Sequence, residues 1–443
     1  MVITTAFKNI KDTGYPLRSA LYEELAENVV SLAIADVCMV GSTVFSLQLH
    51  RRFRASKGLL QWRRGGIWIQ SIYQSVWLLV FTEWPFLQNW TWTAQVFFAL
   101  HTLTFLMKMH SYAFYNGHLS ETARRLQELD EPLTANISRG KAVRYPSSIR
   151  LQSITAESIV SSDDSTPDEQ TRAELDREKH KLELKELRDD LAAELTSTMG
   201  NVTYPQNLTL TNYLDYVLCP TLCYELEYPR TPKIRWLEVF YKTLAVFGCI
   251  FLMTVISSEF VNPIITETSA ALNRSSSLSD QILVLMEAIS IMLFPFMILF
   301  LLTFLVIWEY ALGAFAELSC FADRNFYDDW WNCEDWLEFS REWNIPVYHF
   351  LRRHVYSPTR RLTNHTVATI VTFVMSSIGH ELIMGCISKK LRGYSVFAMM
   401  LQLPVTALQR TKYVRGRWVL NNAFFWGSIV LGITGIAVLY SIV

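Results

Sequence analysis

The sequence has 443 residues, of which 51% are hydrophobic and 18% charged, and its formal net charge is −1 at pH 7. Soluble domains carry about 25% charged residues, so this composition disfavours an ordinary soluble protein and favours one with a large lipid-facing surface. The near-zero net charge and the lack of basic clusters with interleaved aromatic residues exclude nucleic acid as an expected partner.

The N-terminal segment, residues 1–28, is polar and of mixed charge. It lacks the basic region and following apolar stretch of a cleaved signal peptide, so membrane insertion is expected to depend on internal segments. Cys219 and Cys223 are four residues apart, and no His pair accompanies them to complete a zinc site. We therefore expect no metal site, and the scattered cysteines do not indicate a domain built on disulfides.

Apolar segments long enough to cross a bilayer recur along the chain. A hydrocarbon core about 30 Å thick needs about 20 helical residues. Pro295 predicts a kink in the fifth of these segments, which is the longest. The sequence therefore predicts an all-α polytopic membrane protein. The eight candidate spans are residues 29–49, 66–84, 91–107, 237–256, 282–308, 367–387, 394–408 and 418–443.

A long polar insert, residues 116–235, separates the third span from the fourth. Its Ser-rich and acidic part, residues 147–170, predicts a disordered linker. Residues 172–195 carry Glu and Lys at helical spacings, which predicts a solvated charged helix. Residues 220–236, with the sequence PTLCYELEYPRTPKIRW, are aromatic and punctuated by Pro, and we expect them to lie against the membrane.

The distribution of Lys and Arg predicts an orientation, because these residues concentrate in cytosolic loops. The first loop is strongly basic, which places it in the cytosol together with the long insert and residues 323–364. Loop 257–280, which contains a glycosylation sequon at Asn273, is then luminal, as is the C-terminus. One basic cluster disagrees with this topology, because it would be luminal: Lys389, Lys390 and Arg392.

His380 lies inside an apolar span, in the sequence VTFVMSSIGHELIMG. An ionisable residue in a membrane helix is costly and is a functional candidate. Burial disfavours the imidazolium, so this His is expected to be neutral and available as a base; the alternative is a packed His bonded to a neighbouring helix. Ser376 lies one turn earlier and Glu381 follows directly. A covalent serine mechanism is disfavoured, because no Ser lies in a GxSxG turn.

A Trp-rich and acidic segment, residues 326–356, precedes that span. Pro346 starts a new helix there, and the apolar residues after it share one face, which predicts an interfacial amphipathic helix. Such a segment suits a ligand with an apolar tail and an anionic headgroup, or serves only as a membrane anchor. The apolar face comprises Val347, Phe350, Leu351 and Val355, whereas Arg352, Arg353 and His354 are expected to point elsewhere.

Several motifs occur together in this order. FYDDWWN at 326–332, WNIP at 343–346 and HE at 380–381 resemble motifs of the membrane-bound O-acyltransferases, in the branch that acylates sterols and diacylglycerol. Residues 220–236 also resemble that branch. The resemblance covers nearly all of residues 25–443 outside a linker at about 120–200. Three segments are similar to the fungal sterol enzymes of this family: residues 107–117, 342–356 and 401–417.

The resemblance implies roles for individual residues. His380 would be the catalytic base, and Asn344 matches the second active-site residue of the family. Glu381 and Ser377 would line an intramembrane reaction chamber. Four arginines, Arg352, Arg353, Arg360 and Arg361, are either phosphate contacts or surface anchors. The residues expected to bind acyl-CoA are Phe326, Tyr327, Asp329, Trp330, Trp331, Asn332, Trp343, Ser376 and Gln402.

The resemblance also implies an organisation of the whole chain. About eight to nine transmembrane helices would surround the chamber, in an endoplasmic reticulum membrane and as a homo-oligomer. The chain departs from the family at Tyr348 and His349, where relatives place His at the first of the two positions. Relatives also have a longer N-terminal region and one more helix. The expected divisions are a polar segment at 1–28, three helices at 29–115, a cytosolic linker at 116–200, and an acyltransferase core at 201–443 that includes the cytosolic segment 322–363.

These features predict an enzyme that transfers a fatty acyl group from acyl-CoA to the 3-hydroxyl of a sterol. Acyl-CoA is then a co-substrate, and no cofactor is expected. Two alternatives remain at this level: the same chemistry on diacylglycerol, and a lipid transporter or binding protein. No clear inverted repeat supports the transporter.

Overall fold

The computed structural model describes residues 7, 9–11, 14, 27–130, 169–412, 414 and 416–442. Within these residues the protein is helical and contains no β-strand, and the extended contacts there are isolated bridges such as Arg230 with Phe321. The all-α prediction is therefore confirmed for the described part of the chain.

Many helices follow one another with short connections, whereas longer segments precede α7, α8, α9 and η4. Their bounds are α3 Val29–Ser42, α4 Phe45–Ala55, η1 Trp62–Gly66, α5 Ile67–Leu87, α6 Trp92–Asp130, α7 Glu169–Glu194, α8 Leu210–Leu218, α9 Trp236–Ile256, η2 Ser257–Val261, α10 Asn262–Arg274, α11 Leu278–Phe304, η3 Leu305–Ala311, α12 Leu312–Leu318, η4 Trp330–Asn332, α13 Trp336–Glu342, α14 Ile345–Leu351, η5 Arg352–Tyr356, α15 Ser357–Leu362, α16 His365–Ser388, α17 Tyr394–Gln409 and α18 Trp418–Ile442.

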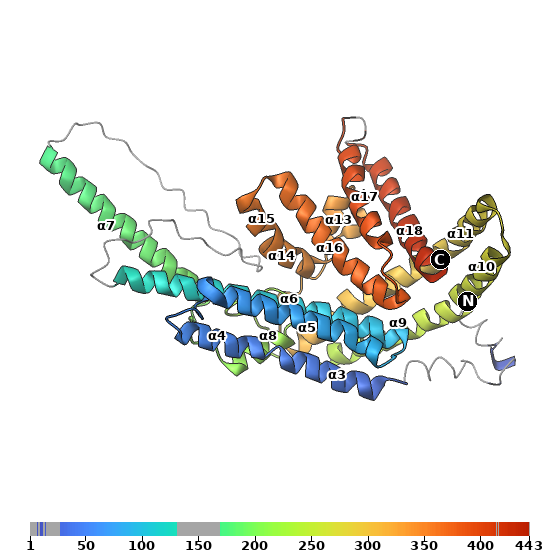
Figure 1. The fold of residues 1–443 in the computed structure, drawn as a ribbon, viewed down its shortest axis with the longest axis horizontal. Helices are drawn as coiled ribbons and strands as arrows, with labels where there is room; N and C mark the ends of the chain where they lie inside the picture. Colours follow the sequence, from blue (N-terminus) through green and yellow to red (C-terminus); the bar gives the residue numbers. More distant parts are fainter. Residues whose placement is uncertain are drawn as a thin grey trace.

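The helices form an elongated assembly (Figure 1). Helices α3 to α6 run along its long axis, α13 to α18 lie on one side of this layer, and α7 projects from one end. Helix α16 packs against both α6 and α17, and α18 packs against α11. Helix α16, which carries the HE dipeptide, is therefore held between the N-terminal layer and the C-terminal helices.

Five helical stretches are long and apolar enough to cross a membrane among the described residues. All eight predicted spans are helical, but residues 66–84, 91–107 and 394–408 are not among these five. The protein therefore has the character of a multi-pass membrane protein, and the count of eight to nine spans stays a prediction. The five stretches are Val29–Ala55, Trp236–Arg274, Leu278–Leu318, His365–Cys386 and Trp418–Ser441.

The first predicted span is two helices rather than one. Helix α3 ends at Ser42 and α4 begins at Phe45. At the junction, the hydroxyls of Ser42 and Thr43 donate to the carbonyls of Met39 and Val40, each at 2.6 Å. Hydroxyls that bond back to the preceding turn compete with the helical ladder and bend helices, which accounts for the interruption.

The fifth predicted span stays a single α-helix through Pro295. Its regular geometry changes later, at the π-helical segment η3, Leu305–Ala311, before α12 continues the same rod. A π-helical turn inserts one residue into the helix and redirects the side chains after it. The irregularity that the structure shows lies beside Glu309, within η3, and a kink at Pro295 stays a prediction.

The charged helix predicted at 172–195 is confirmed as α7. The end of α7 differs from a fully solvated helix, because Leu191 in its last turn and Leu195 directly after it are buried. Glu194 also lies 3.2 Å from His118 of α6, which ties this end of α7 to the helical layer. The linker predicted at 147–170 lies outside the described residues, apart from its last two positions.

The predicted place of residues 220–236 against the membrane stays a prediction, and residues 229–236 are half-buried or exposed. Most of residues 220–228 are buried inside the protein. Tyrosine hydroxyls account for this placement. The Tyr224 hydroxyl donates to Asn212 at 2.6 Å, and the Tyr228 hydroxyl donates to the Cys223 carbonyl at 3.0 Å. A buried tyrosine needs such a partner for its hydroxyl. Here Asn212 lies in α8 and Cys223 in the segment itself, and aromatic content alone does not indicate either partner.

Candidate active site

His380 projects from an exposed face of α16. Its Nδ1 lies 2.9 Å from the carbonyl oxygen of Ser376, one turn earlier in the helix. A carbonyl oxygen can only accept, so Nδ1 carries the proton in this bond. In a neutral imidazole the lone pair then lies on Nε2, which is the atom that can act as a base.

Glu381 lies on a different face of α16 from His380 and is buried. Its carboxylate accepts hydrogen bonds from the backbone N–H groups of Arg392 at 3.0 Å, Gly393 at 2.7 Å and Ser395 at 3.2 Å, and from the hydroxyl of Tyr440 at 2.7 Å. These groups lie at the start of α17 and the end of α18. Glu381 thus holds three helices together, and its predicted place on a chamber wall stays a prediction.

Asn344 is the N-cap of α14. Its side-chain oxygen accepts from the backbone N–H of Val347 at 3.2 Å, which satisfies one of the unpaired amides of the first turn. The cap engages only the oxygen of the side-chain amide, so its NH₂ group remains able to donate. No hydrogen bond joins Asn344 to His380, although both residues lie in the described part of the chain.

The FYDDWWN and WNIP motifs form one structural unit. The backbone N–H of Ile345 donates to the Phe326 carbonyl at 3.1 Å, and that of Asp328 donates to the Glu342 carbonyl at 2.9 Å. These bonds connect the start of the first motif to residues on both sides of Asn344. The two motifs are distinct in sequence but share a single backbone framework.

Tryptophan rings anchor this unit to the membrane helices. Trp330 is 1% exposed, and its ring centroid lies 4.7 Å from that of Trp343. The Trp343 ring stacks on Phe300 of α11 at 4.7 Å, and the Trp330 ring contacts Trp426 of α18 at 5.7 Å. The cluster therefore packs the motifs against two apolar helices, and Trp330 has almost no surface left for a ligand.

The residues predicted to bind acyl-CoA fall into two groups. Phe326 and Trp330 are buried, and they hold the segment in place. Asp329, Trp331 and Asn332 are exposed, and Trp331 is 40% exposed. Only the second group offers free side-chain surface for direct contact with a ligand, while Tyr327 and Trp343 are intermediate.

Tyr327 connects this segment to the membrane helices by a hydrogen bond. Its hydroxyl donates to Glu309 of η3 at 2.8 Å. Burial, and then the bonded Glu309 carboxylate, raise the pKa of Tyr327 to about 12. Glu309 also pairs with Lys242 of α9 at 2.8 Å. Both charges lie in long apolar helical stretches. The rule that selected His380 would have found Lys242, whereas Glu309 follows directly after the predicted fifth span.

The remaining predicted residues lie on the adjacent helices α16 and α17. Ser376 supplies the carbonyl that orients His380, and Ser377 is buried with its hydroxyl on the Val374 carbonyl at 2.8 Å. The Gln402 side chain on α17 is half-buried and bonds only weakly, to the Met399 sulfur at 3.4 Å. The structure thus brings Ser376, His380 and Gln402 onto neighbouring helices.

The prediction that Arg353 points away from the apolar face is wrong. Its side chain is 2% exposed, pairs with Glu225 at 2.9 Å and lies over the Tyr115 ring. The π-helical segment η5, Arg352–Tyr356, accounts for this, because it changes the helical register at that point. Arg352, Arg360 and Arg361 are exposed and remain candidate phosphate contacts.

His354 is also turned inward, and its Nε2 lies 2.9 Å from the Ser111 hydroxyl of α6. Burial, with smaller effects of His110 and Arg353, holds the pKa of His354 well below its usual range. At the departure from the family motif, Tyr348 and His349 are both half-buried in α14. Burial, and then the Arg352 charge, lower the pKa of His349.

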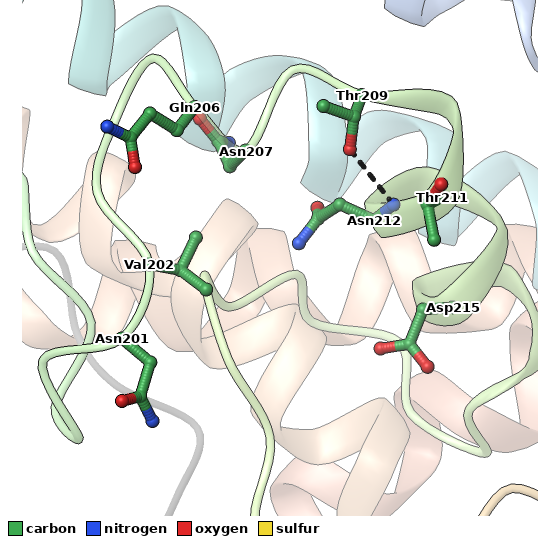
Figure 2. Close-up of a pocket in the computed structure, with 8 residues that line it drawn as sticks. All are labelled: Asn201, Val202, Gln206, Asn207, Thr209, Thr211, Asn212 and Asp215. Atoms are coloured by element: carbon green, nitrogen blue, oxygen red, sulfur yellow. Dashed lines mark hydrogen bonds between the residues drawn. The ribbon is translucent and has the colours of Figure 1, made fainter.

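A polar hollow of about 400 Å³ lies elsewhere, beside the start of α8 (Figure 2). None of the predicted site residues lines it. Several of its side chains have structural roles: Thr209 caps α8 by accepting from the Asn212 N–H at 3.2 Å, and Asp215 pairs with Arg230. Its lining residues are Asn201, Val202, Gln206, Asn207, Thr209, Thr211, Asn212 and Asp215.

Comparison with known proteins gives the family. The model of the membrane-bound O-acyltransferase family matches residues 67–443, and the chain belongs to this family. It is 35% identical to "Probable sterol O-acyltransferase 2" of Schizosaccharomyces pombe, over 99% of this chain and 84% of that protein. It is 34% identical to "Sterol O-acyltransferase 2" of Candida albicans, over 93% of this chain and 68% of that protein. "Diacylglycerol O-acyltransferase 1" of Dictyostelium discoideum is 32% identical over 54% of this chain and 37% of its own length.

Proposed function

We propose that this protein transfers a long-chain fatty acyl group from acyl-CoA to the 3-hydroxyl of a sterol, releasing steryl ester and CoA. The observation that carries the proposal is the similarity to fungal sterol O-acyltransferases along nearly the whole chain. Membership of the acyltransferase family gives the reaction class. It also leaves the alternative of a lipid transporter without support.

Eight to nine spans around an intramembrane chamber that opens to the cytosol would suit the solubilities of the substrates. Sterols and fatty acyl chains dissolve in the bilayer, whereas the CoA nucleotide dissolves in water. A chamber at this boundary lets each substrate stay in its own solvent. It also keeps bulk water from the thioester, which disfavours hydrolysis.

His380 acts as the general base in this proposal. The Nε2 atom takes the hydroxyl proton while the sterol oxygen attacks the thioester carbonyl. The new C–O bond forms, the C–S bond breaks, and the imidazolium returns the proton to the departing CoA sulfur. The Ser376 carbonyl keeps the Nδ1 proton in place during this cycle. The acyl group passes directly to the sterol, without an acyl-enzyme.

Asn344 stabilises the oxygen that becomes negative during the attack. Its side-chain NH₂ can donate while its oxygen remains committed to the helix cap. Loss of one such donor costs roughly 3–4 kcal/mol of transition-state stabilisation in known cases. The rigid cap is suited to this role, because a fixed donor needs no reorganisation as the charge develops.

The acyl donor is assigned to the cytosolic side of the core. Asp329, Trp331 and Asn332 have exposed side chains, which supports this assignment. The exposed Arg352, Arg360 and Arg361 are the candidate contacts for the phosphates of CoA, since guanidinium groups bind phosphate in a bidentate manner. We place the protein in the endoplasmic reticulum membrane as a homo-oligomer, with residues 201–443 as its acyltransferase core.

Diacylglycerol is the second candidate acceptor. The partial similarity to a diacylglycerol O-acyltransferase favours keeping it, because the catalytic chemistry would be the same. The two acceptors differ in the shape of the pocket that receives the hydroxyl. A direct comparison of acceptors therefore decides between them.

The test uses labelled oleoyl-CoA with membranes that contain the wild type, His380→Ala or His118→Ala. Ergosterol, cholesterol and diacylglycerol are offered in parallel. His118 is the matched control, since it lies outside the site and pairs with Glu194. Steryl ester from the wild type and the control, and none from His380→Ala, is the expected result. If the wild type makes triacylglycerol instead of steryl ester, the acceptor is diacylglycerol and not a sterol. If His380→Ala keeps full activity, His380 is not the general base.

A further inference from the structure

Two glutamates of the rod formed by α11, η3 and α12 bridge the same two parts of the protein. Glu317 pairs with Arg235, which precedes α9, and with Arg324 of the following loop. Glu309 pairs with Lys242 of α9 and accepts from Tyr327 of the same loop. Each carboxylate therefore joins the α9 side to the loop that carries the FYDDWWN motif.

The connection through Glu309 has well-defined geometry. Lys242 Nζ lies 2.8 Å from Glu309 Oε1 and 3.1 Å from the Glu309 carbonyl oxygen. Glu309 Oε2 accepts from the Tyr327 hydroxyl at 2.8 Å. The three side chains thus form a continuous chain from a membrane helix to the motif, with both carboxylate oxygens in use.

The surrounding backbone accommodates this chain. Glu309 lies in η3, where the π-helical register redirects its side chain. Gly313 leaves space for Lys242, because a Cβ at that position would lie 2.8 Å from Nζ and 3.0 Å from both Cδ and Cε. A charged lysine and a charged glutamate are each costly inside a membrane, and pairing them offsets that cost.

The chain of contacts continues beyond Tyr327. Its neighbour Phe326 accepts from the Ile345 N–H at 3.1 Å, directly beside Asn344. A displacement of Tyr327 would therefore move the exposed residues of segment 326–332, whereas the N-cap of α14 keeps the Asn344 side chain in place.

We propose that Lys242, Glu309 and Tyr327 form a positioning relay that fixes segment 326–332 for the acyl donor. The relay rests on the proposed function for its substrate, and none of its three members contacts the reacting atoms. It sets the affinity for acyl-CoA by holding Asp329, Trp331 and Asn332 in a receptive arrangement. Sterol affinity does not depend on it.

The first experiment compares Tyr327→Phe with Tyr241→Phe in steady-state kinetics. Tyr241 is the matched control, because it is 56% exposed on α9. Tyr327→Phe removes only the donor hydroxyl, so the KM for oleoyl-CoA should rise about tenfold, as for loss of one hydrogen bond to a charged group. The KM for sterol and kcat should stay unchanged, and Tyr241→Phe should match the wild type in every parameter.

The second experiment removes the acceptor without leaving a lone charge. The double variant Lys242→Met/Glu309→Met replaces the pair by apolar side chains of similar volume, a change that is often tolerated. It should raise the KM for oleoyl-CoA to the level of Tyr327→Phe. Adding Tyr327→Phe should then have no further effect, because the hydroxyl has already lost its partner.

A readout that needs no catalysis separates the relay from the proposed function. Amide hydrogen exchange across residues 323–335 should be faster in purified Tyr327→Phe than in the wild type or Tyr241→Phe. Unchanged exchange and unchanged KM, or additive effects in the triple variant, would overturn the relay. Absence of steryl ester from the wild type would instead overturn the proposed function, and the exchange data would still decide the relay.

Discussion

His380 and Glu381 are neighbours in sequence, but one is exposed and the other is buried on α16. The imidazole is exposed, and its hydrogen bond is to the Ser376 carbonyl of its own helix. The carboxylate is buried and accepts four hydrogen bonds from other parts of the chain. His380 is therefore positioned for catalysis, and Glu381 for holding the helices together. Substitution of His380 should reduce activity, and substitution of Glu381 should reduce stability.

Replacing His380 should abolish activity and leave the fold intact. His380→Gln keeps a polar side chain of similar size but removes the base, so kcat should fall by about 10²-fold or more. Its exposed side chain packs against little, so the melting temperature should stay within the error of the wild type. Activity assays and thermal unfolding of the purified protein in detergent check both parts.

Replacing Glu381, in contrast, should destabilise the fold. In Glu381→Gln an NH₂ group takes the place of one acceptor oxygen and faces N–H donors, so the fold should lose about 1–3 kcal/mol. Glu287→Gln is the matched control, since Glu287 is exposed on α11. Thermal unfolding of both variants measures the difference, and equal melting temperatures would contradict the structural role of Glu381.

Among the elements, the rod of α11, η3 and α12 has the features that hydropathy alone predicts least well. Its apolar sequence predicted a span, and the structure confirms a long apolar helix there. The π-helical segment within it was not predicted, because a register change depends on the partners of the helix. Here those partners are Lys242 on one side and Tyr327 on the other.

Gly313→Ala tests how closely Lys242 packs across this rod. The added Cβ would meet the lysine side chain at 2.8–3.0 Å, so stability should fall by about 1–3 kcal/mol through overpacking. Gly248→Ala on α9 is the control, because a Cβ there meets nothing within 4 Å. The control should gain roughly 0.5–1 kcal/mol from higher helix propensity. A stable Gly313→Ala variant would show that Lys242 moves aside without cost.

At the scale of the whole molecule, buried polar contacts connect its two halves. Lys108 of α6 donates to the Cys219 carbonyl at 2.7 Å. Arg353 donates to the Tyr224 carbonyl at 3.0 Å and pairs with Glu225. His354 reaches Ser111 of α6, 243 residues away in sequence. The loop around residues 219–225 thus lies between the N-terminal layer and the C-terminal core.

Loss of Arg353 should therefore destabilise the whole protein. Arg353→Met leaves the Glu225 carboxylate buried without its cation, which typically costs about 3–5 kcal/mol. Arg352→Met is the matched neighbour, and its exposed side chain should leave stability unchanged. The melting temperature and the yield of folded protein distinguish the two variants. Equal stability would show that the Glu225 pair contributes nothing to the assembly.

The sequence by itself determined the properties that depend on local pattern. Hydropathy located the apolar helices, helical spacing located α7, and ordered motifs indicated the family and pointed to His380 and Asn344. Local pattern was less informative about which residues are buried. It did not indicate that most of residues 220–228 are buried, and it placed Arg353 on the surface although its side chain is buried. Those placements depend on partners elsewhere in the chain.

Only the tertiary structure decided how these pieces are joined. The union of the two motifs, the burial of Trp330, the four bonds of Glu381 and the Lys242–Glu309–Tyr327 chain all require contacts between separate segments. The physical reason is that a buried charge or hydroxyl is stable only beside its partner. Periodicity along a helix shows which face a residue occupies, but not which residue lies opposite that face.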